Sequence, residues 1–353
     1  MIYYQHWLDL YQKQLKFYER LLRQPESYWS TFNQVILEKE TLRLRYFPSK
    51  DKRVTTPILI LPPQAGHHSN ITDYSPEQSL VRIFQNQGFD VYVTQWLDPK
   101  ETYENLGIED YIGFTNEAVD EILADTGEKS LHLVGQCQGG WQAAIYTSLF
   151  PEKISSLVVA AAPINFEAEK GPLNDIVDRL PLGFYEFLVT SGFGLLRGNY
   201  MLMGFKYLDP YQHYYKKYID LWNLIWSQNE AGLERFDRFE NWYELIQNLP
   251  GKFYLEVVEN IFKKNGMINK ETLKLKGKFV DLENIECPLI LMAGEKDNIT
   301  PPEQCLDMKN HVSTPEEDIM EVTTRGGHIG TLMGRTSLKY YWTAVSEKLM
   351  KVS

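Results

Sequence analysis

One cysteine of this chain stands in a setting suited to covalent chemistry. Cys137 lies within the sequence G-Q-C-Q-G-G, residues 135–140, which follows an apolar run and precedes a helix-compatible stretch. A buried strand, a tight turn and a helix in this order form a nucleophile elbow. In such a turn, a side chain at Gly135 or Gly139 would collide with the neighbouring backbone. Because the nucleophile would be sulfur, we expect acyl chemistry through a thioester.

The same cysteine also has a structural interpretation. A free cysteine is often a small buried hydrophobic residue, and an isolated G-x-C-x-G arises by chance in many proteins. The residues downstream favour chemistry, since an aspartate and a histidine follow at the places where a catalytic triad needs them.

The candidate acid lies on the loop after a later apolar strand, residues 288–294. Two carboxylates stand on this loop, Glu295 and Asp297. Glu295 directly follows the glycine that ends the strand. Asp297 lies further into the loop and immediately precedes the turn-forming sequence N-I-T-P-P, so it is the better candidate.

The candidate base follows from elimination among the seven histidines. Four lie in a terminal helix, in a strand interior, in the helical middle of the chain or before the last strand: His6, His132, His213 and His311. Of the other three, His328 follows the last strand on a glycine-rich loop, from which an imidazole can reach a nucleophile. Its alternative is an ordinary surface histidine. A protonated imidazole beside a thiol favours the reactive thiolate, and Asp297 would fix the tautomer and orientation of the ring.

Two backbone N–H groups are expected to stabilise the negative charge that develops on the reacting carbonyl oxygen. The first belongs to Gln138, at the start of the helix that follows the elbow. The second comes from the loop after the first central strand, residues 64–69, where Ala65 is the candidate. His67 and His68 on this loop either contact substrate or cap a turn, and the sequence leaves both roles open.

Alternating strands and helices must carry these residues. A pair of edge strands is expected over 34–46, and apolar central strands are expected at 57–63, 90–96, 131–136, 156–162, 288–294 and 319–324. Helices are expected at about 109–125, after the elbow, and from about 331. This alternation implies a mostly parallel central sheet flanked by helices. The order nucleophile, acid, histidine is that of the α/β-hydrolase fold, which is the predicted fold class.

Strand character disappears in the middle of the chain. Aromatic residues and helix formers dominate there, which predicts a helical cap, residues 165–284, inserted into a core formed by 35–164 and 285–353. The aromatic residues of the cap either line an acyl pocket or form the cap's own core. An N-terminal helical segment, 1–34, carries an amphipathic stripe that packs either on its own domain or against a partner subunit or polymer surface.

Composition limits the classes of function. The 353 residues suffice for one large α/β domain with an insertion, and the net charge of −11 argues against nucleic acid as the main partner. No apolar stretch approaches the roughly 20 residues of a membrane helix. The start lacks the basic and apolar regions of a signal peptide, so a cytoplasmic location is expected. Cys137, Cys287 and Cys305 have no metal-ligand spacing, and no metal site is expected.

Together these motifs resemble the poly(3-hydroxyalkanoate) synthases, particularly the short catalytic subunits of the two-component classes. The similarity covers roughly residues 40–350, in order. Besides the cysteine box it includes Asp110-Tyr111-Ile112, Ala162-Pro163-Ile164-Asn165-Phe166, Asn265-Gly266 with Asn269, Val280-Asp281-Leu282, Ile285, Cys287-Pro288 and Gly326-Gly327-His328-Ile329-Gly330.

The resemblance implies Cys137 as nucleophile, His328 as base and Asp297 as acid. It implies a (3R)-hydroxyacyl-CoA substrate, polymerised into polyhydroxyalkanoate with release of CoA, and no bound cofactor. Synthases of this length lack the long N-terminal domain of the one-component enzymes. The resemblance therefore implies a second synthase subunit, with a homodimer and the polymer granule surface as further expected partners.

Three departures from the family's pattern leave the exact reaction open. Asn298 stands where the family commonly has a histidine after the acid; residues 96–99 read W-L-D-P, and residues 64–67 read Q-A-G-H. The last segment is closer to the A-G-H of intracellular polyhydroxyalkanoate depolymerases and of a synthase-like family of unassigned role. The alternatives are therefore a hydrolase with a cysteine nucleophile, either a polyhydroxyalkanoate depolymerase or an acyl-CoA thioesterase, and a non-catalytic granule-associated homologue.

Overall fold

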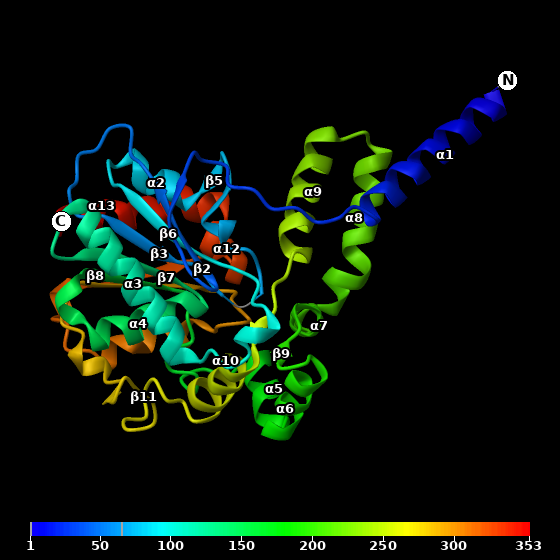
Figure 1. Ribbon diagram of the computed structural model, residues 1–353. Helices are drawn as coiled ribbons and strands as arrows, with labels where there is room; N and C mark the ends of the chain where they lie inside the picture. Colours follow the sequence, from blue (N-terminus) through cyan, green and yellow to red (C-terminus); the bar gives the residue numbers. More distant parts are fainter. Residues whose placement is uncertain (1, 65) are drawn as a thin grey trace. The chain divides into compact units, whose positions relative to one another are not determined.

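The computed structural model describes residues 2–64 and 66–353 (Figure 1). Its contacts divide the described chain into two compact units. The first, which we call the helical unit, takes in Met1–Ser27 and Gly198–Ile246. The second, the sheet unit, takes in Tyr28–Arg197 and Gln247–Ser353.

An eight-stranded sheet forms the centre of the sheet unit, with strand order β1-β2-β6-β3-β7-β8-β13-β14. The bounds are β1 Gln34–Glu38, β2 Leu42–Phe47, β3 Ile58–Leu61, β6 Val91–Trp96, β7 Leu131–Gln136, β8 Ile154–Ala160, β13 Leu289–Gly294 and β14 Ile319–Thr324. From β6 to β14 neighbouring strands pair in parallel, and β2 pairs antiparallel with both β1 and β6. The predicted mostly parallel sheet, with an antiparallel pair at one edge, is confirmed.

Helices cover both faces of the sheet, as its apolar strands require. Every residue of β3, β6, β7 and β13 is buried, so these strands need cover on both sides. The helices α3, Ile108–Thr126, and α4, Gln138–Leu149, pack together, with α4 on β7 and β8. The helices α2, Leu80–Asn86, and α13, Thr343–Lys351, lie on the opposite face (Figure 1). The expected layered α/β architecture is therefore present.

Shorter elements complete the sheet unit. Its other α-helices among the described residues are α5 Pro172–Arg179, α6 Leu182–Ser191, α10 Gly251–Glu256, α11 Pro302–Leu306 and α12 His328–Met333. Its two-stranded pairs are β4 Asp73–Ser75 with β5 Gln78–Ser79, β9 Leu195–Leu196 with β10 Leu249–Pro250, and β11 Lys274–Leu275 with β12 Lys278–Phe279.

The helical unit joins the N-terminal helix to helices from the middle of the chain. Its helices are α1 Ile2–Leu21, α7 Gly198–Leu208, α8 Lys217–Trp226 and α9 Glu230–Glu244. Leu221, Ile225 and Leu233 are buried between α8 and α9, and Phe17 of α1 packs against them. Lys16 forms an ion pair of 2.5 Å with Glu230. One side of α1 therefore packs within its own unit.

Residues 165–284 contribute to both units, although the sequence assigned them to a single cap. Residues 198–246 belong to the helical unit, and the flanking parts belong to the sheet unit. The division into core and cap at 164/165 and 284/285 therefore stays a prediction. None of the described helices has the length and apolar character needed to cross a membrane.

Candidate active site

Cys137 lies at the sharp turn between β7 and α4. Its backbone angles are φ 52° and ψ −118°, a strained conformation for a residue with a side chain. The turn is held on both sides, because the N–H of Cys137 donates to the carbonyl of Ala160 and the N–H of Gly140 donates to that of Cys137, both at 2.8 Å. The thiol is partly exposed and free of any disulfide. The predicted elbow geometry is confirmed.

Close backbone contacts explain the glycines beside Cys137. A Cβ atom on Gly135 would collide with the carbonyl oxygen of Gly139. One on Gly139 would collide with the carbonyl oxygen of Leu61 in β3. The expectation that side chains at these two positions would strike the backbone is confirmed, and it shows how tightly the elbow is packed against β3.

Asp297 and His328 form a buried hydrogen-bonded pair. Asp297 lies on the loop after β13, and His328 is the first residue of α12. The His328 Nδ1 and the Asp297 Oδ2 are 2.7 Å apart, and the Asp297 side chain is wholly buried. The other carboxylate oxygen accepts the N–H groups of Ile299 (2.9 Å) and Thr300 (2.8 Å). The turn after Asp297 therefore fixes the carboxylate, and the carboxylate fixes the imidazole.

The same surroundings control the charge of His328. Burial lowers its pKa, but the charges of Asp297 and then of Cys137, together with hydrogen bonds to both side chains, outweigh burial. The pKa of His328 is therefore raised well above its ordinary value. The raised pKa favours the positively charged ring, and a positive charge beside sulfur favours a thiolate. The structure thus brings Cys137, Asp297 and His328 together.

The rejected candidates are engaged elsewhere. Glu295 is exposed, so Asp297 is the carboxylate of this loop that meets a histidine. His132 is wholly buried in β7 and binds two serine hydroxyls, while His311 binds Asp307 at 2.9 Å. His213 lies 3.2 Å from the hydroxyl of Tyr243. Among the described residues, no group of three or more His, Cys, Asp or Glu side chains could hold a metal ion.

One of the two predicted oxyanion donors can be located. Gln138 begins α4, so its N–H lies at the helix end next to the nucleophile. Ala65 lies outside the described residues, and its role stays a prediction. Beside it, Gly66 has a φ of 88° and its carbonyl accepts the N–H of Gln247 at 2.6 Å. The loop after β3 is therefore tied to the chain segment that precedes β10.

His68 supports this loop as a turn cap. Its Nδ1 lies 3.1 Å from the backbone nitrogen of Asn70, and its Nε2 lies 3.1 Å from the side-chain nitrogen of Gln95. Burial lowers the pKa of His68 to about 4, so the ring is neutral at physiological pH. Capping is thus the role that this geometry supports for His68. His67, only 9% exposed, lies on the same loop, and substrate contact by either residue stays a prediction.

Sequence reasoning missed the glutamines around the nucleophile. The side-chain nitrogen of Gln136 donates to the carbonyl of Leu332 at 3.4 Å, which links the nucleophile strand to the histidine helix α12. The side-chain nitrogen of Gln142 in α4 donates to the side-chain oxygen of Gln64 at 3.3 Å, which links α4 to the loop after β3. The spacing of Gln138 and Gln142, four residues apart in a helix, was the signal that could have shown a shared polar face.

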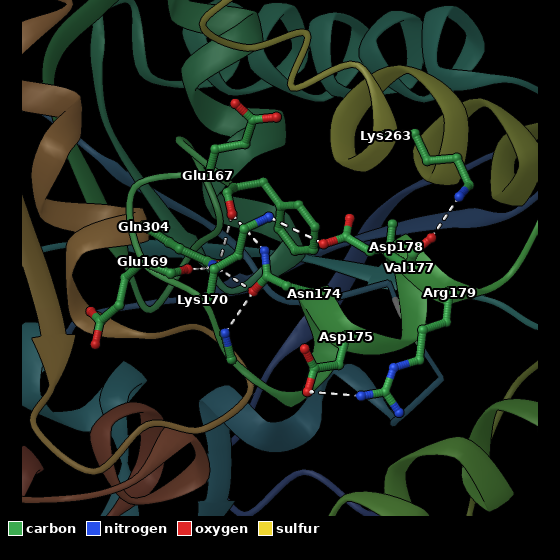
Figure 2. A network of polar contacts seen from close by, with 12 residues as sticks. Glu167, Glu169, Lys170, Asn174, Asp175, Val177, Asp178, Arg179, Lys263 and Gln304 are labelled. Atoms are coloured by element: carbon green, nitrogen blue, oxygen red, sulfur yellow. Dashed lines mark hydrogen bonds and ion pairs between the residues drawn. The ribbon is translucent and has the colours of Figure 1, made fainter.

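A second polar network lies beside the acid loop (Figure 2). The side-chain nitrogen of Gln304 donates to the carbonyls of Phe166 (3.2 Å) and Glu169 (2.8 Å) and to the side-chain oxygen of Asn174 (2.9 Å). The side chain of Asn174 is fully buried and donates in turn to the Phe166 carbonyl at 2.7 Å. Because α11 directly follows the acid loop, this network fixes the segment after β8 beside that loop.

Comparison with known proteins assigns the chain to a family. Residues 37–329 match the family described as "Protein of unknown function (DUF3141)". The chain is 32% identical to the poly(3-hydroxyalkanoate) polymerase subunit PhaC of Haloferax mediterranei, over 91% of this chain and 64% of that protein. It is 30% identical to the subunit PhaC of Synechocystis sp., over 84% of this chain and 78% of that protein. The chain belongs to the poly(3-hydroxyalkanoate) polymerase family. The resemblance carried by the sequence motifs is thereby confirmed, although the chain spans less than two thirds of the Haloferax polymerase subunit.

Solved structures show the same fold as this family member. A monoacylglycerol lipase from Paleococcus ferrophilus matches with a TM-score of 0.57 at 18% identity, covering 90% of this chain and all of that one. The mouse α/β hydrolase domain-containing protein 10 matches with a TM-score of 0.53 at 16% identity, covering 92% of this chain and all of that one. At these identities the likeness concerns the fold alone, and the predicted α/β-hydrolase fold is confirmed.

Proposed function

We propose that this chain polymerises (3R)-hydroxyacyl-CoA into polyhydroxyalkanoate through a covalent thioester on Cys137, with release of CoA. The observation that carries the proposal is a partly exposed cysteine at a strained elbow, coupled to a buried His328–Asp297 pair. The names of the curated polymerase relatives support the substrate class.

The first step transfers the acyl group to the enzyme. The Cys137 thiolate attacks the carbonyl carbon of the acyl-CoA thioester, and negative charge develops on the carbonyl oxygen. The N–H of Gln138, and a second from the loop after β3 at Ala65, stabilise that charge. As the bond from carbon to the CoA sulfur breaks, the His328 imidazolium gives its proton to the leaving sulfur, so CoA departs as a thiol. His328 is then neutral.

The second step extends the polymer. The 3-hydroxyl of another acyl unit attacks the thioester carbonyl, and neutral His328 takes the hydroxyl proton. An ester bond forms while the bond from carbon to the Cys137 sulfur breaks, which regenerates the thiolate and the imidazolium. Asp297 stays ionised and stabilises the charged ring in both steps. The cycle uses the CoA thioester as substrate and needs no further cofactor.

Exclusion of water separates this reaction from hydrolysis. The thioester on Cys137 reacts with an alcohol or with water by the same mechanism, so a synthase must keep water away from it. We propose that a second synthase subunit or a second copy of the chain, together with the growing polymer in the cytoplasm, provides this exclusion. The word "subunit" in the names of the polymerase relatives supports an assembly of this kind.

The test measures CoA release and polymer formation together. The purified chain is supplied with (3R)-hydroxybutyryl-CoA, with and without a candidate partner subunit. We expect CoA release and polymer to rise in parallel, and Cys137→Ala to abolish both. Cys287→Ala is the matched control and should retain both, since burial raises the pKa of the Cys287 thiol to about 12 and keeps it protonated.

Other outcomes favour the alternatives. CoA release that yields only free hydroxy acid would identify a cysteine hydrolase with thioesterase activity. Cleavage of oligomer without chain growth would identify a depolymerase. Absence of any turnover by the complete assembly, with polymer binding retained, would identify a non-catalytic homologue.

A further inference from the structure

Two glutamines of α4, the helix that begins directly after the proposed nucleophile, have buried side chains. Gln138 directly follows Cys137 and is 6% exposed, and Gln142 lies one helical turn further and is 1% exposed. The side-chain oxygen of each has no hydrogen-bond partner among the described residues. Both side chains belong to α4, in which every residue is buried.

The two glutamines share one face of α4. Residues four apart in a helix lie above each other, so the side chains of Gln138 and Gln142 are neighbours. The side-chain nitrogen of Gln142 binds Gln64, which lies on the loop after β3. This face of α4 is therefore turned toward the loop on which the second oxyanion donor is proposed.

Two buried oxygens without hydrogen-bond donors are unusual unless a ligand supplies the donor. Most buried polar side-chain atoms in folded proteins have a hydrogen-bond partner, because an unpaired buried acceptor destabilises the fold. Two unpaired acceptors on one helix face, next to a reactive cysteine, fit a hydrogen-bond donor supplied by the substrate. A 3-hydroxyacyl chain carries one such donor, two carbons from the thioester carbonyl.

We propose that the amide oxygen of Gln138, with Gln142 beside it, accepts a hydrogen bond from the 3-hydroxyl of the acyl group. This inference rests on the proposed function and assigns the residues that recognise its substrate class. An acyl chain without the hydroxyl would enclose the same acceptors and leave them unpaired, so the site selects against it. Gln138 is thus a substrate-binding residue through its side chain, in addition to its backbone N–H.

The test compares two substrates that differ by the hydroxyl alone. Acylation of Cys137 is followed in a single turnover with (3R)-hydroxybutyryl-CoA and with butyryl-CoA, by CoA release and by the mass of the acylated chain. We expect the native chain to react about tenfold faster with the hydroxylated substrate. Gln138→Met keeps the side-chain size and the backbone N–H but lacks the amide oxygen, and it should bring the ratio of the two acylation rates close to one. Gln142→Met should lower the ratio at least about threefold.

The ratio of the two acylation rates separates loss of hydroxyl recognition from loss of folding, because misfolding slows both reactions alike. Gln85→Met on α2 is the matched control and should keep the native ratio. Equal rates of the native chain with both substrates, or a native ratio in Gln138→Met, would overturn the inference while the proposed function stands. If Gln138→Met fails to fold, so that the butyryl reaction is also lost, an unchanged ratio in Gln142→Met overturns the inference. A native chain that neither substrate acylates would overturn the proposed function and this inference together.

Discussion

The carboxylate of Asp297 holds one ring nitrogen of His328, which leaves the other free to face the nucleophile. This arrangement sets both the orientation and the charge of the imidazole, because Asp297 is wholly buried and its charge raises the pKa of His328. The effect of the carboxylate charge on His328 can therefore be tested by a substitution that keeps the shape of the Asp297 side chain.

Asp297→Asn should remove the charge while keeping the shape. Without the carboxylate the pKa of His328 falls, so the imidazolium is lost at lower pH and the tautomer is no longer fixed. We expect the single-turnover rate of CoA release to fall by about 10³-fold or more. The midpoint of the His328 titration, followed by NMR, should shift to lower pH. Glu295→Gln, on the same loop but exposed, should leave both unchanged; equal loss in the two variants would contradict the pairing.

His132 gives a prediction for stability rather than catalysis. Burial lowers its pKa from 6.5 to about 4, whereas in the unfolded chain it binds a proton near pH 6.5. Between pH 4 and pH 6.5 the unfolded state binds more protons at this residue than the folded state. The stability that neutral His132 gives the folded state is therefore fully present above pH 6.5 and is lost as pH falls toward 4. We expect it to amount to about 3 kcal/mol at most. Urea unfolding of His132→Asn should depend less on pH across this window than that of the native chain, with the exposed His6→Asn as control.

The site residues that could be predicted were those fixed by local pattern and chain order. Glycines on both sides of Cys137 specify an elbow, and the loop positions of Asp297 and His328 follow from the strand order. The sequence contains no indication of the side-chain role that we propose for Gln138, and it could not decide between substrate contact and capping for His68. Both roles depend on which buried polar atoms find hydrogen-bond partners once β6, α4 and the loop that follows β3 have packed together.

At the scale of elements, the elbow works because β3, β7 and α4 approach one another closely. The carbonyl of Leu61 at the end of β3 occupies the space that a side chain on Gly139 would need. Backbone atoms on both sides leave no flexible group that could move away. The position of the nucleophile is thus set by strand packing.

Gly139→Ala should therefore destabilise the fold strongly. The added methyl group meets backbone atoms, and relief of the clash would require β3 and α4 to separate. We expect the free energy of unfolding, measured in urea, to fall by about 3 kcal/mol or more, or no folded protein to form. Gly204→Ala in α7, where an added Cβ meets nothing within 4 Å, should be neutral or stabilise by up to about 1 kcal/mol. A loss of similar size in both variants would show that the packing argument is wrong.

The elements of the sheet unit were largely predictable, whereas the grouping of the middle helices was not. Apolar runs such as Leu289–Gly294 have the length and composition of buried parallel strands and need no other information. The membership of residues 198–246 in a unit with α1 depends on contacts such as Phe17 against Leu221, about two hundred residues apart in the chain. No local pattern contains that information.

At the scale of the whole molecule, the two units differ in the amount of buried apolar surface. In the sheet unit, buried apolar side chains occur in every strand of the central sheet except β1 and in helices on both faces, while the apolar cluster of the helical unit centres on Leu221, Ile225 and Leu233. Local opening costs less where fewer apolar side chains are buried.

Hydrogen exchange should reveal this difference. We expect amides of α8 and α9 to exchange faster than those of β7 and β8, as measured by mass spectrometry of peptides from the intact chain. Leu221→Ala should accelerate exchange in α1, α8 and α9 while leaving β7 protected. Equal protection of α8 and β7, or acceleration in β7 by this substitution, would contradict the division into two units.

The composition of the helical unit has a consequence for biosynthesis. The helix α1 ends at Leu21, but α8 begins at Lys217, so 195 residues (22–216) are synthesised between them. At about 5–20 residues per second, α1 waits roughly 10–40 s for the helices that cover Phe17. During that time the aromatic side chains of α1 are available to chaperones or to neighbouring nascent chains. Codon usage and chaperone supply over residues 22–216 should therefore influence how much of this protein reaches its folded form.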